Sequence, residues 1–168
     1  MRIGFALAEH RTSLIEALTE LNGYYNEDIP PDRALVAAHL DENLLPVTSP
    51  TRLVVAAEGG EVFGLAAIAI VYSIVEPAPD KRKQLALKEL FVRSAARGKR
   101  IGEAIMAWVA NYARSQGCSR IDWNVKSSNA GGIAFYTALG ARRVKDCLSY
   151  RLDREAIDAL ADHPIDRA

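Results

Sequence analysis

The spacing of apolar residues in this 168-residue chain changes from the period of a strand to that of a helix within its central third. From Leu85 to Val92, apolar side chains fall on both faces of an extended segment, which is typical of a central strand. After Ile101 they recur at the spacing of one helical face, at Ile105, Trp108, Val109 and Tyr112. The short loop Arg97–Gly102 lies between these two predicted elements.

The remaining segments alternate between strand-like and helix-like periods. In chain order they predict a strand at 1–8, a helix over 14–21 that ends at Gly23, a helix over 32–44, strands at 53–57 and 62–75, a strand at 119–125, a helix at 130–139, a strand at 143–152 and a short helical tail. Paired glycines at 59–60 indicate a tight hairpin turn. This order predicts an α/β (α+β) fold with a partly parallel sheet, in a single domain spanning residues 1–168.

The loop Arg97–Gly102 has the composition of a phosphate-binding turn. Its glycines allow the backbone to approach a ligand closely, and the free amides and dipole at a helix start favour an anion. Arg97, Lys99 and Arg100 add positive charge that suits a pyrophosphate. The dinucleotide pattern G-x-G-x-x-G and the triphosphatase pattern G-x-x-x-x-G-K-[ST] are absent, which argues against both of those nucleotide binders.

The amino-acid composition argues against several classes of binding partner. The chain has 21 basic and 21 acidic residues, so no overall field favours nucleic acid or an anionic membrane. Its two cysteines are too few for a disulfide framework, and its three histidines lack metal-ligand spacing. No secretory signal pattern or transmembrane stretch is evident. We therefore expect a cytoplasmic protein without a metal, a nucleic-acid partner or a membrane partner.

Two motifs resemble those of the GNAT N-acetyltransferase family. The family's acetyl-CoA loop reads Q/R-x-x-G-x-G/A after a central strand; Arg97 and Gly102 match its ends, and Arg100 stands at the inner glycine. Residues 129–141, NAGGIAFYTALGA, are similar to N-x-x-A-x-x-F-Y-x-x-x-G-F, with Gly132 for the alanine and Ala141 for the aromatic residue. The resemblance covers most of the chain. It implies the acyl-CoA N-acyltransferase fold, a mixed central sheet flanked by helices, with acetyl-CoA as donor and a homodimer as the assembly.

The same resemblance implies direct transfer of an acetyl group to a primary amine. Tyr136, carried over from the family's F-Y pair, is expected to act as the acid for the departing thiolate. Strand alternation predicts that Glu89 shares a face with Leu85, Leu87 and Phe91, where apolar neighbours would raise its pKa and suit it as a general base. The alternative is an ion pair between Glu89 and a basic neighbour.

The donor-binding residues follow from the two motifs and the strand before them. Backbone groups at the end of the strand would contact pantetheine, the loop would hold the pyrophosphate, and Asn129 would contact pantetheine or cap its helix. The expected acetyl-CoA-binding residues are Leu90, Phe91, Val92, Arg97, Gly98, Lys99, Arg100, Ile101, Gly102, Glu103, Asn129, Phe135 and Tyr136.

The resemblance also implies an acceptor cleft between the N-terminal helices and the central strands. Its expected wall residues are Tyr24, Tyr25, Glu27 and Asp28, whose aromatic and acidic groups suit a cationic amine, although a solvated loop is the alternative. Residues 120–129 are similar to the diamine and thialysine acetyltransferase branch, which favours a small polyamine-like or amino-acid-like acceptor. Lys88 stands where diamine acetyltransferases tend to carry a glutamate. A CoA-binding sensor without turnover, and a protein lysine or N-terminal acetyltransferase, remain alternatives.

Overall fold

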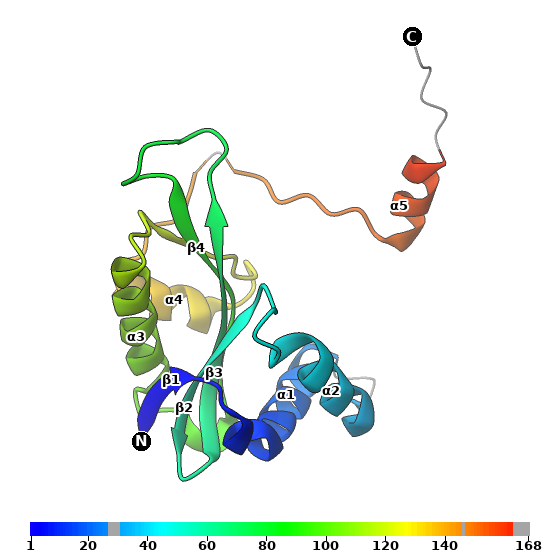
Figure 1. Ribbon diagram of the computed structural model, residues 1–168, viewed down its shortest axis with the longest axis vertical. Helices are drawn as coiled ribbons and strands as arrows, with labels where there is room; N and C mark the ends of the chain where they lie inside the picture. Colours follow the sequence, from blue (N-terminus) through cyan, green and yellow to red (C-terminus); the bar gives the residue numbers. More distant parts are fainter. Residues whose placement is uncertain (27–30, 146, 163–168) are drawn as a thin grey trace. The chain divides into compact units, whose positions relative to one another are not determined.

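The computed structural model describes residues 1–26, 31–145 and 147–162 (Figure 1). Its contacts divide the chain into two compact units, Met1–Ser128 and Asn129–Ala168, which are treated separately below. The single domain expected from the sequence stays a prediction.

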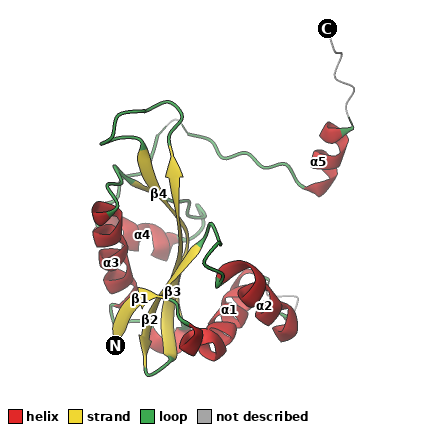
Figure 2. Ribbon diagram, viewed as in Figure 1, coloured by secondary structure: helices red, strands yellow, loops and turns green. Residues whose placement is uncertain are grey.

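A five-stranded mixed sheet forms the centre of the first unit (Figure 2). Its strands lie in the order β1 (Arg2–Phe5), β2 (Arg52–Glu58), β3 (Glu61–Tyr72), β4 (Lys83–Val92) and β5 (Ile121–Asp122). The first three pairings are antiparallel and β4 pairs with β5 in parallel. Gly59 and Gly60 turn the β2–β3 hairpin with φ angles of 55° and 85°, as a two-residue turn with two left-handed positions requires. The predicted fold class and this hairpin are confirmed.

Helices cover both faces of that sheet (Figure 1). A 3₁₀ turn at Ala8–His10 leads into α1 (Arg11–Tyr25); α2 (Arg33–His39) continues as a π-helical turn (Leu40–Leu44); a 3₁₀ turn at Ser94–Ala96 precedes α3 (Ile101–Ser115). Helices α1 and α2 enclose the main hydrophobic core against one face of the sheet, and α3 packs on the other. The buried residues of the main core are Leu14, Ile15, Ala17, Leu40, Leu53, Val55, Ala57, Val62, Leu65 and Phe91.

Helix α1 is longer than the sequence predicted. Gly23 does not end it, and the helix continues for two further residues to Tyr25. One glycine inside a helix costs only about 1 kcal/mol relative to alanine, which packing of the apolar face against the core outweighs. Tyr24 and Tyr25 therefore project from the last helical turn rather than from a loop.

Gly64 on β3 allows α3 to approach the sheet closely. A methyl group added there would lie 3.0 Å from the Phe91 carbonyl oxygen, 3.1 Å from Ile105 Cδ1 and 3.2 Å from Ile101 Cγ2. These atoms belong to the backbone or to buried side chains that have little room to move.

Replacing Gly64 with alanine should lower the free energy of unfolding by about 1–3 kcal/mol, because the added methyl group overpacks the α3–sheet contact. Thermal or urea unfolding measures the loss. Gly4→Ala is the matched control, since a methyl group at Gly4 on β1 meets nothing within 4 Å. Equal stability of the two variants would contradict the close approach of α3.

The second unit contains two helices, α4 (Ala130–Ala138) and α5 (Arg154–Ala161). The predicted strand Arg143–Leu152 is wrong, because its described residues adopt no strand. The alternating pattern gives this segment the propensity of a strand, but a strand forms only where a neighbour pairs with its backbone, and the described residues of this unit include no other strand. None of the described helices has both the length and the apolar character needed to cross a membrane.

Candidate active site

The β4 strand contains a bulge at Lys88 that reverses its alternation. Leu87 pairs with Ile68 and Glu89 pairs with Ala67, so two adjacent residues of β3 face three of β4. Glu89 therefore shares the α1 face with Phe91 and Leu65, whereas Leu87 points to the opposite face. The prediction that Glu89 lies on the face of Leu85 and Leu87 is wrong, because an extra residue inverts every later side chain. Its placement beside Phe91 is right.

Beyond the bulge, β4 has an open edge. Strand β5 pairs only with Leu85 and Ala86, so no strand of the described chain covers the later part of β4 on that side. Backbone groups of alternate residues point to this edge: the Leu90 N–H lies 3.3 Å from Glu89 Oε1, and the Val92 carbonyl accepts from Arg97 Nε at 3.2 Å. An extended amide chain could pair with Leu90 and Val92 here. The Phe91 side chain is buried in the core instead.

The loop after β4 presents free amides at the start of α3. Gly98 and Arg100 both have left-handed backbone angles, with φ of 76° and 58°. Within the described parts of the chain no side chain caps α3, so the amides of its first residues, Ile101, Gly102 and Glu103, are available to an anion at the positive end of the helix dipole. The exposed side chain of Lys99 adds a positive charge to this loop.

Arg100 has a left-handed backbone, with φ of 58°, at the position where the acetyl-CoA loop pattern that this segment resembles carries its inner glycine. A non-glycine residue is strained in the left-handed region by roughly 1 kcal/mol. Its side chain donates to Glu103 Oε2 from Nε at 2.9 Å and from a terminal nitrogen at 2.7 Å. Arg100 is thus neutralised by Glu103, and the free positive charge of the loop comes from its neighbours.

Two glutamates of α1 fix the start of this loop, a contact that sequence reasoning missed. Glu20 accepts from the Ser94 N–H at 2.7 Å and from Arg93 Nε at 3.2 Å, and Glu16 lies 3.5 Å from Arg93. Burial opposes ionisation of Glu20, but the hydrogen bonds from Ser94 and Arg93 outweigh it and lower its pKa. The spacing of Glu16 and Glu20, one helical turn apart, is the only signal of this contact in the sequence.

Tyr25 and Glu89, both predicted site residues, meet in the structure. The Tyr25 hydroxyl lies 3.3 and 3.2 Å from the two Glu89 carboxylate oxygens. Burial raises the pKa of Glu89, while hydrogen bonds from Tyr25 and the Leu90 amide partly offset that effect. Glu89 forms no ion pair with any residue that the structure describes, so the ion-pair alternative finds no support there.

A lysine not predicted from the sequence completes this cluster. Lys126 Nζ lies 4.8 Å from the centroid of the Tyr25 ring, and the Tyr24 ring packs edge-on against Tyr25 at 5.3 Å. The end of α1, the bulge of β4 and the segment after β5 therefore meet at Tyr25. The predicted wall residues Glu27 and Asp28 lie outside the described residues.

The second unit holds the other predicted site residues. Asn129 caps α4 by accepting from the Gly132 N–H at 2.8 Å, which is one of the two roles expected for it. The rings of Phe135 and Tyr136 pack edge-on at 5.1 Å within α4, and Tyr136 is half-buried.

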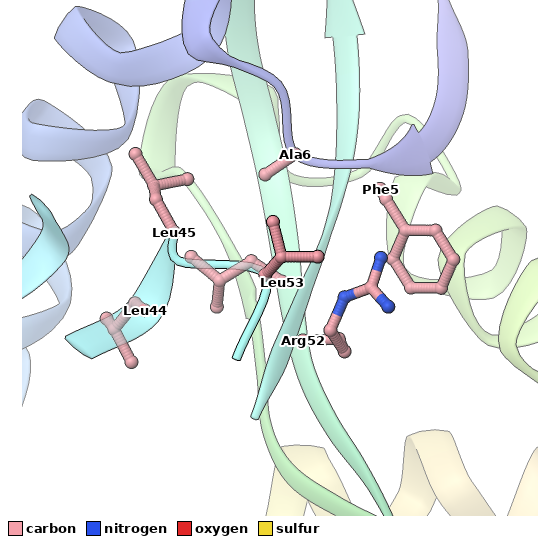
Figure 3. Close-up of a pocket in the computed structure, with 7 residues that line it drawn as sticks. Phe5, Ala6, Leu44, Leu45, Arg52 and Leu53 are labelled. Atoms are coloured by element: carbon pink, nitrogen blue, oxygen red, sulfur yellow. The ribbon is translucent and has the colours of Figure 1, made fainter. Parts of the chain in front are cut away.

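A cavity of about 150 Å³ lies apart from this cluster, between β1, β2 and the turn after α2 (Figure 3). The Arg52 guanidinium carbon lies 4.1 Å from the centroid of the Phe5 ring, and both side chains line the cavity. The cavity is lined by Phe5, Ala6, Leu44, Leu45, Val47, Arg52 and Leu53, none of which is a predicted site residue.

The chain is similar to known acetyltransferases. Residues 13–141 match the profile of the acetyltransferase (GNAT) family. The chain is 35% identical over 83 residues to the thialysine N-epsilon-acetyltransferase of Mus musculus, covering 45% of this chain and 46% of that protein. It is 31% identical over 74 residues to L-ornithine N5-acetyltransferase NATA1 of Arabidopsis thaliana, covering 44% and 32%. The chain thus spans about a third to a half of these relatives' lengths.

Solved structures extend the similarity to the fold. An integron cassette protein from the mobile metagenome of V. cholerae superposes with a TM-score of 0.86 at 28% identity, covering 96% of this chain and 98% of that one. The aminoglycoside N-acetyltransferase AAC(6')-Iy, solved with CoA, superposes with a TM-score of 0.65 at 17% identity, covering 90% and 99%. The second likeness concerns the fold alone.

Proposed function

Because the chain belongs to the acetyltransferase (GNAT) family, we propose that it transfers an acetyl group from acetyl-CoA to the primary amine of a small polyamine-like or amino-acid-like acceptor. The observation that carries this proposal is the Glu89 carboxylate, whose pKa burial raises, beside the open edge of β4. A base of this kind is what an amine needs before it can attack an acyl group.

The residues around the loop suit CoA. Leu90 and Val92 offer backbone groups to the amides of the pantetheine arm, and the uncapped start of α3 offers N–H groups to the pyrophosphate. Arg97 and Lys99 supply positive charge beside those amides. Acetyl-CoA, when bound, supplies the activated acyl group and a thiolate leaving group.

Glu89 has the environment of a general base for the acceptor. A primary amine has a pKa of about 10 and is mostly protonated at neutral pH, so it has no lone pair with which to attack. Glu89 accepts that proton directly or through a water molecule, and Tyr25 orients the carboxylate through its hydroxyl. Tyr136, by resemblance to the family's F-Y pair, donates a hydrogen bond or a proton to the leaving sulfur.

Release of the CoA thiol from acetyl-CoA tests this function. The acceptors would be spermidine, putrescine, thialysine, an aminoglycoside, free amino acids and a lysine-bearing peptide. Release that depends on a small amine is the expected result, and release with the peptide alone would identify a protein acetyltransferase.

A CoA-binding sensor is the second candidate, favoured by the strained, Glu103-paired Arg100 in the loop. It predicts thermal stabilisation by CoA together with no thiol release across the whole panel of amines.

A further inference from the structure

The 3₁₀ turn after β4 leads directly into the proposed phosphate-binding loop. Ser94–Ala96 forms this turn, and its own hydrogen bonds run from the Ala96 N–H to the Arg93 carbonyl at 2.9 Å and from the Arg97 N–H to the Ser94 carbonyl at 3.3 Å. The first amide of such a turn, the Ser94 N–H, has no acceptor within the turn. The group that binds this amide therefore helps to set where the loop begins.

A carboxylate of α1 binds that amide. Glu20 Oε1 accepts from the Ser94 N–H at 2.7 Å, although the two residues lie 74 positions apart in the chain. Oε2 of the same side chain accepts from Arg93 Nε at 3.2 Å, and a terminal nitrogen of Arg93 lies 3.5 Å from the Val62 carbonyl oxygen of β3. Glu20 and Arg93 thus connect the start of the loop to both α1 and β3.

The charge of Glu20 and its hydrogen bond to the loop have opposite effects on an anionic ligand. A negative charge near a phosphate site repels the ligand, so by Coulomb's law its removal should tighten CoA binding. A carboxylate that fixes the loop backbone keeps the amides at the start of α3 directed at the pyrophosphate, so its removal should weaken binding. The short contact between Glu20 and the Ser94 amide favours the second effect.

Resting on the proposed function, we infer that Glu20 is a positioning residue for the donor: its carboxylate orients the loop Arg97–Gly102 through the Ser94 amide and strengthens CoA binding, although its charge has the same sign as the ligand. Ser94 is exposed, so water can replace Glu20 on this amide. Ala96 is buried and still anchors the turn. Loss of Glu20 should therefore displace the loop without unfolding the protein.

Calorimetric binding of CoA distinguishes the two effects. Glu20→Ala should raise the Kd of CoA by about tenfold, the effect of losing one hydrogen bond. Glu20→Gln loses the same charge but keeps an oxygen for the Ser94 N–H, so its Kd should stay within about threefold of the wild-type value. Glu16→Ala is the matched comparison, because it removes an equal charge from α1 and leaves the Ser94 amide bound; its Kd should change less than about twofold.

Donors with and without the pyrophosphate show where the effect arises. S-Acetylpantetheine has the thioester and the pantetheine arm but no pyrophosphate. In Glu20→Ala, kcat/KM should fall about tenfold for acetyl-CoA, through a higher KM, and stay near the wild-type value for S-acetylpantetheine. General damage, or a shift of α1 that disturbed the contact between Tyr25 and Glu89 at its other end, would lower both values equally.

Equal or tighter CoA binding in Glu20→Ala would overturn the inference and leave the proposed function standing. So would a Glu20→Gln variant as weak as Glu20→Ala, or equal losses with the two donors. The Kd comparison needs no turnover, so a protein that bound CoA and acetylated none of the amines would lose the proposed function and still decide the role of Glu20. Absence of CoA binding by the wild type would remove both.

Discussion

Replacing Glu89 with glutamine should lower kcat/KM for amine acetylation by roughly a hundredfold or more near neutral pH, the usual range for loss of a general base. Glutamine has nearly the same size and keeps an oxygen that can accept from the Tyr25 hydroxyl, but it cannot take a proton from the acceptor. The loss should shrink toward pH of about 10, where the amine is free without help. A loss of equal size at every pH would indicate a structural role instead.

The pH dependence of the wild-type protein's acetylation rate gives a second test of the proposed role of Glu89. A base acts only when deprotonated, so activity should rise with pH through the pKa of Glu89, which burial raises above the ordinary glutamate value. Glutamine does not titrate, and this acid limb should vanish from the variant. Tyr25→Phe removes a hydrogen bond that favours the carboxylate, so it should move the limb to higher pH.

The melting temperature of Glu89→Gln distinguishes loss of a general base from damage to the fold. A carboxyl group whose pKa is raised by folding stabilises the folded protein below the unfolded pKa, and that contribution is lost as pH rises through the folded pKa. Glutamine removes the cost of ionising the buried group, so at neutral pH Glu89→Gln should unfold at the same temperature as the wild type or higher. A clear fall in melting temperature would attribute the lost activity to misfolding.

The bulge at Lys88 shows where reasoning from one strand fails. The order of strands and helices in the first unit follows from local period, because each element must bury its own apolar face. Whether a strand contains an extra residue depends on its partner, and only the register with Ala67 and Ile68 reveals it. The sequence therefore predicted that the Glu89 carboxylate is partly buried. It did not predict on which face of the sheet the side chain lies, or that it contacts Tyr25.

Long-range contacts account for the other residues that the sequence did not identify. Glu20 meets Arg93 across 73 positions, and Lys126 meets Tyr25 from the segment after β5. The spacing of residues within these segments predicts neither contact, because both contacts depend on how α1 packs on the sheet. Arg100 is a different case, because the sequence already shows an arginine where the family pattern has glycine. The structure adds that this residue has a left-handed backbone, which strains a non-glycine residue.

Replacing Tyr136 with phenylalanine should lower kcat by about a hundredfold while changing CoA affinity less than twofold, because the change removes only the hydroxyl that we propose serves the leaving sulfur. The ring that packs against Phe135 is retained, so α4 should keep its stability. Single-turnover rates of acetyl transfer and calorimetric binding of CoA measure the two quantities separately. Tyr72→Phe is the matched control, since that tyrosine is exposed on β3 and should leave both unchanged.

Comparing the effect of Tyr136→Phe on kcat with its effect on CoA affinity shows which role Tyr136 has. An interaction that exists only as the thiolate departs lowers kcat and leaves ground-state binding intact. If CoA affinity fell as much as the rate, the hydroxyl would be holding the donor in place and Tyr136 would be a binding residue. Unchanged turnover in Tyr136→Phe would remove the Tyr136 hydroxyl from the chemistry.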